Sequence, residues 1–191
     1  MSNQIDSVDL TILSHLKNNG RMPITRLAEK IGISRQTIAN RLKRLTHDGR
    51  VIIKGGLDLM KLGFKMASVG LEVKNEATRR DVEKYLKNCP RVLTIFRTPE
   101  KANIHIDVWG EDDQTINSTV ESFRDLENVE VVYNHYLGHL IHGDIIIGVN
   151  SNQQDVSPCG RSCNDCYRYN NSWCVGCPVT FDYKNPLLTS K

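Results

Sequence analysis

Apolar residues recur at helical spacing in three short segments near the N-terminus. Asp6 and Ser34 are favourable N-caps, and Gly20 and Gly32 are favourable stops for the first two helices. This pattern predicts helices over residues 7–19, 24–31 and 35–47. The residues expected to face inward are Leu10, Leu13 and Leu16, then Leu27, Ala28 and Ile31, then Ile38, Leu42 and Leu45. Helices joined by a tight glycine-containing turn are typical of a helix-turn-helix.

The pattern changes to alternating apolar and polar residues in the middle of the chain. It predicts strands over residues 67–73, 92–97, 104–109 and 129–137, with Val129, Val131 and Tyr133 on one face of the last. Helices are expected over residues 77–87 and after Asp113. The order βαββαβ is that of a ferredoxin-like domain. Apolar residues continue to Val149, which indicates one further short strand.

The exposed side of the third predicted helix carries residues that suit DNA. Opposite its apolar stripe, at about 100° per residue, lie Gln36, Asn40, Lys43, Arg44 and His47. Gln and Asn match an adenine edge, whereas Arg and Lys match guanine or phosphate. The N-terminal end of this helix usually reaches the bases. We therefore predict DNA contacts by Ser34, Arg35, Gln36, Thr37, Asn40, Arg41, Lys43 and Arg44.

The charge distribution agrees with this prediction. The chain of 191 residues has a net charge of +3, and its composition of 39% hydrophobic and 25% charged residues is ordinary for a globular protein. Residues 1–54 hold 10 basic and 4 acidic residues (+6), residues 55–154 hold 11 and 15 (−4), and residues 155–191 hold 4 and 3 (+1). A basic helix-turn-helix is the electrostatic signature of a nucleic-acid partner.

A continuous series of short motifs covers residues 6–52. They are Asp6-x-x-Asp9, Ile12-Leu13-x-x-Leu16, Asn19-Gly20-Arg21, Leu27-Ala28-x-x-Ile31-Gly32-Ile33-Ser34, Arg41-Leu42-x-x-Leu45, and Gly49-x-Val51-Ile52. Together they resemble the Lrp/AsnC (feast/famine) transcription regulators. The resemblance extends to the βαββαβ order, because these regulators join an N-terminal helix-turn-helix to such a domain. It also implies a strand over Val51–Lys54.

The resemblance implies partners for the middle domain. In the family this domain forms the homodimer, often assembles further into tetramers or octamers, and binds a small effector after its third strand. The corresponding residues here are Gly110, Asp112 and Asp113. Those acidic residues also suit the N-terminus of a helix without any ligand.

Five of the six cysteines lie in a short C-terminal segment, and their spacing is that of a metal site. Cys159, Cys163, Cys166, Cys174 and Cys177 follow the pattern Cys-x3-Cys-x2-Cys-x7-Cys-x2-Cys. Paired Cys-x2-Cys turns bring four thiolates to one ion, and so short a segment needs the metal to fold. We predict one metal centre, either Zn or an iron–sulfur cluster. Cys89 stands alone and is expected to be a buried, inert thiol.

Other features of the sequence narrow the class of protein. No apolar run approaches the roughly 20 residues that cross a bilayer, and the N-terminus lacks a signal-peptide pattern, so we expect a cytoplasmic protein. His135, His139 and His142 are interleaved with apolar residues, and a strand would put His135 and His139 on one face. Isolated histidines in strands are more often hydrogen-bonded structural residues than metal ligands.

These observations lead to one expected architecture, which is α+β. It comprises a winged helix-turn-helix over residues 1–60, a ferredoxin-like βαββαβ dimerisation and effector domain over 61–149, a linker over 150–158, and a Cys-rich, metal-stabilised tail over 159–191. The function expected is that of a dimeric or larger, sequence-specific transcription regulator with a metal or redox sensor, and not of an enzyme. The alternatives are an Lrp-like sirohaem decarboxylase or haem-binding protein, and an architectural DNA-binding protein.

Overall fold

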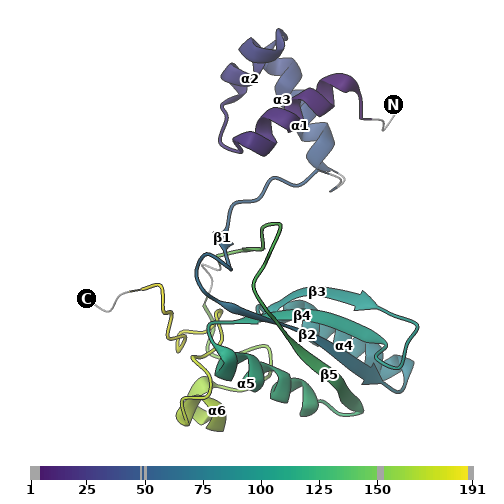
Figure 1. Ribbon diagram of the computed structural model, residues 1–191, viewed down its shortest axis with the longest axis vertical. Helices are drawn as coiled ribbons and strands as arrows, with labels where there is room; N and C mark the ends of the chain where they lie inside the picture. The colour runs from purple at the N-terminus through teal and green to yellow at the C-terminus, as the bar shows by residue number, and fades with distance from the viewer. Residues whose placement is uncertain (1–4, 48, 50, 150–152, 189–191) are drawn as a thin grey trace. The chain divides into compact units, whose positions relative to one another are not determined.

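The computed structural model divides the chain into two compact units, Met1–Gly55 and Gly56–Lys191 (Figure 1). It describes residues 5–47, 49, 51–149 and 153–188. Among these residues no helix is both long enough and apolar enough to cross a membrane.

The first unit contains the three helices that the sequence predicts. They are α1 (Ser7–Asn18), α2 (Ile24–Ile31) and α3 (Arg35–His47). The side chain of Asp6 caps α1 in a reciprocal capping box with Asp9, and Ser34 Oγ accepts from the Thr37 amide at the start of α3. Gly32 ends α2 in the left-handed conformation with φ of 77°. The core of this unit consists of Ile12, Leu27, Ala28 and Ile38.

Two details of the first unit differ from the prediction. Leu10 is 59% exposed, whereas the adjacent Asp9 and the nearby Ile12 are fully buried, so the inward face of α1 is rotated from the expected one. The strand expected over Val51–Lys54 does not form, since the described residues there are irregular and the first strand, β1, is Leu57–Asp58. The described part of this unit is therefore a helix-turn-helix without strands of a wing.

The buried carboxylate of Asp9 explains the rotation of α1. Arg41 Nη1 contacts Asp9 Oδ1 at 2.8 Å and Asp6 Oδ2 at 2.6 Å, and Arg44 Nη2 contacts Asp9 Oδ2. A buried carboxylate is stable only when it is paired and hydrogen-bonded. Two arginines of α3 supply these partners, which fixes α1 against α3.

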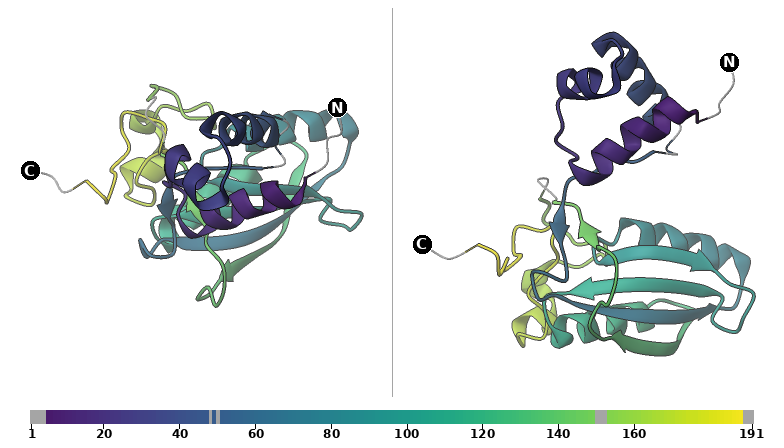
Figure 2. Two further views of the ribbon diagram at one scale, coloured as in Figure 1. Left: turned by 90° about the horizontal axis from the view of Figure 1, so that it is seen from above. Right: turned by 45° about the horizontal axis from the view of Figure 1, so that its top comes forward.

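The second unit is built on a four-stranded antiparallel sheet. Its strands are β2 (Lys65–Val73), β3 (Val92–Arg97), β4 (Ile104–Gly110) and β5 (Val129–Leu137), in the spatial order β3-β4-β2-β5. The helices α4 (Glu76–Asn88) and α5 (Asp113–Arg124) lie together against one face of the sheet (Figure 2). The order and topology confirm the predicted βαββαβ arrangement. The core between sheet and helices includes Val69, Leu71, Ile106, Val120 and Phe123.

A bulge in β5 changes the face on which Tyr133 lies. Leu71 pairs with Val131 but Gly70 pairs with Tyr133, so Val132 is an extra residue in β5. Tyr133 therefore lies on the face opposite the helices, and the prediction that it shares a face with Val129 and Val131 is wrong. Its ring covers Gly70, where an added Cβ would come within 2.2 Å of a ring carbon.

The open face of the sheet carries a hydrogen-bonded polar network. His105 Nδ1 and Tyr133 Oη are 2.5 Å apart, and His105 Nε2 lies 2.9 Å from Ser68 Oγ. Ser68 and Thr94 both donate to the Asp107 carboxylate, at 3.1 and 2.6 Å. The network gives these polar side chains partners where no helix covers them.

One end of the open face is covered by the residues that flank the sheet. The strand β6 (Ile146–Ile147) pairs with β1, and a second small core there includes Phe64, Met66 and Trp109. The further strand expected before Val149 is thus present but short. The shared face expected for His135 and His139 does not form, because β5 ends at Leu137 and the residues after it are loop.

We expect Asp9→Ala to lower the free energy of unfolding of the first unit by about 1–3 kcal/mol. The change removes half of the capping box and leaves Arg41 and Arg44 without their buried partner, although both arginines reach solvent. Urea denaturation of the full chain, followed by far-UV circular dichroism, measures this loss. The matched control is Glu29→Ala, an exposed acid of α2 whose loss should change stability by less than about 0.5 kcal/mol. Equal stability of the two variants would contradict the role assigned to Asp9.

Candidate DNA-binding face and thiol cavity

The solvent-facing side of α3 carries most of the predicted DNA contacts. Gln36 Nε2 donates to Asn40 Oδ1 at 3.0 Å, which aligns two amide side chains along the helix. At its start, Ser34 Oγ and Thr37 Oγ1 are 2.8 Å apart. The predicted residues that are exposed are Ser34, Arg35, Gln36, Thr37, Asn40, Lys43 and Arg44. This face therefore offers both hydrogen-bonding and cationic groups to a ligand.

Arg41 and Arg44 have ion-pair partners within the first unit, which the sequence pattern does not indicate. Arg41 is only 25% exposed and is bound to Asp6 and Asp9, and the neighbouring carboxylates raise its pKa. Arg44 is 40% exposed and is bound to Asp9. Both side chains hold α3 against α1. Their predicted DNA contacts would have to use the guanidinium nitrogens that are not bound to Asp6 or Asp9.

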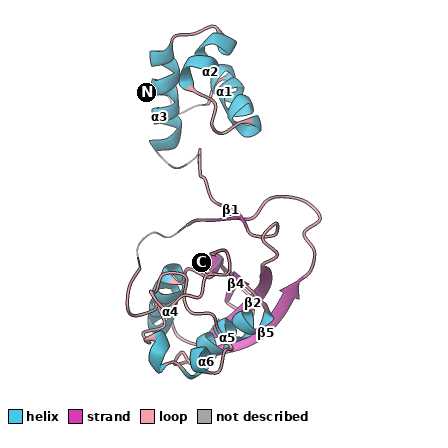
Figure 3. Cartoon of the chain, turned by 90° about the vertical axis from the view of Figure 1, so that its left-hand side faces the viewer, coloured by secondary structure: helices cyan, strands magenta, loops and turns pink. Residues whose placement is uncertain are grey.

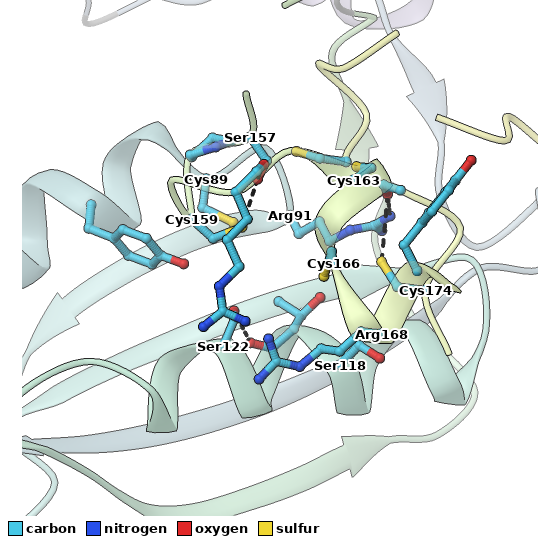
Figure 4. A pocket seen from close by; sticks show the side chains of 17 residues that line it. Cys89, Arg91, Ser118, Ser122, Ser157, Cys159, Cys163, Cys166, Arg168 and Cys174 are labelled. Atoms are coloured by element: carbon cyan, nitrogen blue, oxygen red, sulfur yellow. Dashed lines mark hydrogen bonds between the residues drawn. The ribbon is translucent and has the colours of Figure 1, made fainter. Parts of the chain in front are cut away.

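The second site is a cavity in the other unit that all six cysteines line. Its volume is about 80 Å³, well above the roughly 10–15 Å³ that one water needs. Figure 4 shows the thiols around its wall together with Arg91 and Arg168. The five tail cysteines meet here as their spacing suggests, and Cys89, expected to be isolated, lines the same cavity. The six cysteines are Cys89, Cys159, Cys163, Cys166, Cys174 and Cys177.

Short turns of the tail position its cysteines. Residues 156–162 form a tight loop in which Val156 pairs with Ser162 and Gly160 has φ of 76°. The first Cys-x2-Cys pair is closed by a bond from the Cys166 amide to the Cys163 carbonyl, within the 3₁₀ helix Cys163–Asp165 that precedes α6 (Tyr167–Asn170). In the second pair, Gly176 has φ of 92° and lies against Asp182 and Tyr183. Glycine at these turns permits the close backbone approach that the pairs require.

The predicted linker is part of this structure where it is described. Gln154 pairs with Thr180, and Ser157 is buried with its hydroxyl donating to the Arg161 carbonyl. Residues 150–152 of that prediction lie outside the described residues. The remainder packs with the tail and does not behave as a separate spacer.

A buried arginine fastens the tail to the sheet domain. Arg91 precedes β3, and its Nη1 contacts Glu111 at 2.7 Å while its Nη2 donates to the Gly176 carbonyl at 2.7 Å. Tyr183 donates to the other oxygen of Glu111. Burial alone would lower the pKa of Arg91, but Glu111 and the nearby thiols raise it overall, so the guanidinium stays charged.

Two further contacts hold the tail against α5. Arg168 Nη2 contacts Asp125 Oδ2 at 2.6 Å, just beyond the end of that helix. Ser118 Oγ, on α5 itself, donates to the Trp173 carbonyl. These contacts therefore hold the tail next to α5, whose residues also line the cavity.

Burial affects the protonation of three thiols of the cavity. It raises the pKa of Cys89 and of Cys174, and it raises that of Cys177 to about 12. These three thiols are thus neutral at physiological pH. Each would have to lose its proton to bind a metal, as thiolate ligands do.

The donor set fits a thiophilic metal, although the thiols do not converge on one point. Within the described ranges, no three His, Cys, Asp or Glu side chains are close enough to hold an ion as they stand. The wall nevertheless carries six sulfur donors, and the buried Arg168 Nε has no hydrogen-bond acceptor among the described residues. A thiolate or sulfide drawn into the cavity would supply such an acceptor.

The residues predicted to contact an effector have structural partners. Asp112 caps α5 by accepting from the Thr115 amide at 2.7 Å. Gly110 packs closely on the same helix, because an added Cβ would lie 3.0 Å from the side chain of Ile116. Asp113 lines an open depression with Lys65, Tyr136 and Leu137. The three residues do not form a common site, and their effector role stays a prediction.

Residues 5–46 match the AsnC-type helix-turn-helix domain. The chain carries an AsnC-type helix-turn-helix. It is 26% identical over 125 residues to the transcriptional regulator LysM of Saccharolobus solfataricus, covering 65% of this chain and 87% of LysM. These matches support an Lrp/AsnC-type transcriptional regulator, and they agree with the prediction of a regulator and not an enzyme.

Solved structures of regulators share the fold. AsnC of E. coli superposes with a TM-score of 0.66 at 18% identity, over 75% of this chain and 98% of that one. A Neisseria meningitidis transcriptional regulator in complex with L-Met superposes with a TM-score of 0.65 at 21% identity, over 77% of this chain and 98% of that one. The chain thus shares the fold of these regulators over most of their length.

We expect Gln36→Ala and Lys43→Ala to affect DNA binding differently. Gln36→Ala should relax the sequence preference by about 1–3 kcal/mol, because an amide that reads a base edge is lost. Lys43→Ala should weaken binding to all sequences alike and reduce the salt slope by about one. Fluorescence anisotropy with a selected site and a scrambled site, over a series of salt concentrations, separates the two effects. Lys17→Ala on α1 is the control, and equal behaviour of the two α3 variants would refute the assigned face.

Proposed function

We propose that this protein is a sequence-specific, DNA-binding transcription regulator whose C-terminal tail holds a sensory metal centre. The observation that supports DNA recognition most directly is the polar, basic face of α3 within the AsnC-type domain. An architectural role without sequence preference would need only phosphate contacts, whereas Gln36 and Asn40 also offer base-reading amides.

The chain acts as a homodimer in this proposal. The sheet of the second unit is covered by helices on one face only, and Phe96 and Leu137 are 55% and 44% exposed on the other. A second copy would cover these apolar side chains. Two linked helix-turn-helix units also bind a two-fold DNA site far more tightly than one unit. Larger assemblies, tetramers or octamers, and a small effector such as an amino acid belong to this proposal as extensions.

The metal centre would be held by the tail cysteines Cys159, Cys163, Cys166, Cys174 and Cys177, as Zn or an iron–sulfur cluster. The cavity that they line and the two buried arginines beside it support the proposal. Metal binding stabilises whatever fold it requires, so occupancy of the centre biases how the tail is docked on the sheet domain. A change in that docking is the signal that would alter assembly or DNA affinity.

Selection of bound sequences from a random DNA pool tests the DNA-binding part of the proposal. We expect one enriched, two-fold symmetric motif, with a specific affinity at least about 10³ times the non-specific one. Recovery of unrelated sequences, with equal affinity for all of them, would instead identify an architectural protein.

The sensory part is tested by replacing four tail cysteines, Cys163, Cys166, Cys174 and Cys177, with serine. Protein purified without oxygen should contain a metal in the wild type and none in this variant, and DNA affinity should depend on metal only in the wild type. Elemental analysis and the visible spectrum measure the metal content, and anisotropy measures the DNA affinity. The control is Ser162→Ala, within the same tail. A variant that keeps metal-dependent DNA affinity would refute the sensor.

A further inference from the structure

The metal centre, if it is confined to the tail, would leave one thiol of the cavity unexplained. We infer that Cys89, which belongs to the sheet domain, is a ligand of this centre together with cysteines of the tail. The inference rests on the proposed function and deepens it, because it makes the centre a bridge between two parts of the second unit.

Cys89 is placed by rigid structure and not by the tail. It is the C-cap of α4, where its amide donates to the Leu86 carbonyl at 3.1 Å and its carbonyl accepts from the Val92 amide at 3.1 Å. The following turn is held in turn by Trp109, whose Nε1 donates to the Pro90 carbonyl at 2.9 Å. A cysteine whose backbone is fixed in this way is a suitable ligand, since the position of its backbone does not depend on the tail.

Cys89 lines the same cavity as the five cysteines of the tail. Figure 4 shows Cys89 and Cys159 on the same side of the cavity. The sheet domain therefore supplies one sulfur to a cavity whose other sulfurs come from the tail.

The surroundings of Cys89 differ from those of an inert thiol. A free cysteine that serves only packing is a small apolar group and has apolar neighbours. The cavity beside Cys89 is lined instead by five other thiols, by the buried Arg91 and Arg168, and by hydroxyl groups of α5. Cationic groups lower the electrostatic cost of several thiolates in one place, which is what a metal centre requires.

A shared centre would link the metal to the sheet. Each coordinating thiol gives its proton to solvent as the metal–sulfur bond forms, and no electron is transferred. The bond from Cys89 then connects the ion to the turn between α4 and β3. Through the bonds of Arg91 and Trp109, this turn is tied to the end of β4. Metal binding at the centre would therefore affect the sheet domain as well as the tail.

Metal binding by Cys89→Ala in the full chain tests this inference. The protein is purified without oxygen, stripped of metal, and titrated with Co²⁺ and then with Zn²⁺. We expect the Zn²⁺ affinity to fall at least about tenfold, and the sulfur-to-cobalt charge-transfer band to lose about one quarter of its intensity, because one of four thiolates is lost. The matched control is Ser122→Ala, which alters the wall of the same cavity without removing a sulfur. The control should retain wild-type affinity and band intensity.

Measurements on the unmodified chain guard against misfolding of the variant. Alkylation with iodoacetamide, followed by mass spectrometry, should label Cys89 more slowly in the Zn²⁺-bound protein than in the stripped protein. Hydrogen exchange of the amides of residues 89, 91 and 92 should slow on adding Zn²⁺ in the wild type and stay unchanged in Cys89→Ala.

The outcomes separate this inference from the proposed function. If Cys89→Ala keeps wild-type affinity and band intensity while the four-cysteine tail variant loses both, Cys89 is not a ligand and the tail centre stands. Loss of affinity in Ser122→Ala to the same extent would assign the effect to cavity shape and overturn the inference. A wild-type chain that binds neither Co²⁺ nor Zn²⁺ and contains no iron or sulfide would overturn both.

Discussion

The buried guanidinium of Arg91 is the interaction on which the second unit depends. It joins three segments that the backbone leaves separate: the turn before β3, the start of α5 through Glu111, and the tail through the Gly176 carbonyl. Its cation also lies 5.3 Å above the Trp109 ring. A segment of so few residues has too little apolar surface to fold alone, so the tail needs an anchor of this kind. Loss of any one partner would leave a charge or polar group buried without compensation.

The first unit uses the same physical solution on a smaller scale. Asp9 is fully buried, and Arg41 and Arg44 neutralise it from α3. The helix that presents the candidate DNA-binding face is therefore oriented by an ion-pair cluster that includes two of its own arginines. In both units a buried charge sets the position of a functional segment, because its pairing permits few alternative geometries.

The elements of the fold could be predicted from the sequence because their signals are local. The bounds of α2, β3 and β5 agree with the prediction to the residue, since caps, glycines and alternation lie within a few positions of each end. The face of Tyr133 could not be predicted, because the bulge at Val132 exists only relative to the partner strand β2. The burial of Asp9 was missed for a similar reason, since its two partners lie more than thirty residues away on α3.

The candidate thiol site shows where spacing ceases to be informative. The tail cysteines are close in sequence, so their pattern indicates a common site, and the structure places all five around one cavity. Cys89 gave no such signal, because α4, β3, β4 and α5 must fold before it reaches that cavity.

The acidic residues of segment 55–154 also have a structural role. Part of their charge is used within the chain: Glu111 holds Arg91 and Tyr183, and Asp125 holds Arg168. These carboxylates compensate the charge of the arginines beside the thiols. Part of the acidic charge of the middle segment therefore holds the tail in place, and does not serve only contacts with a partner subunit.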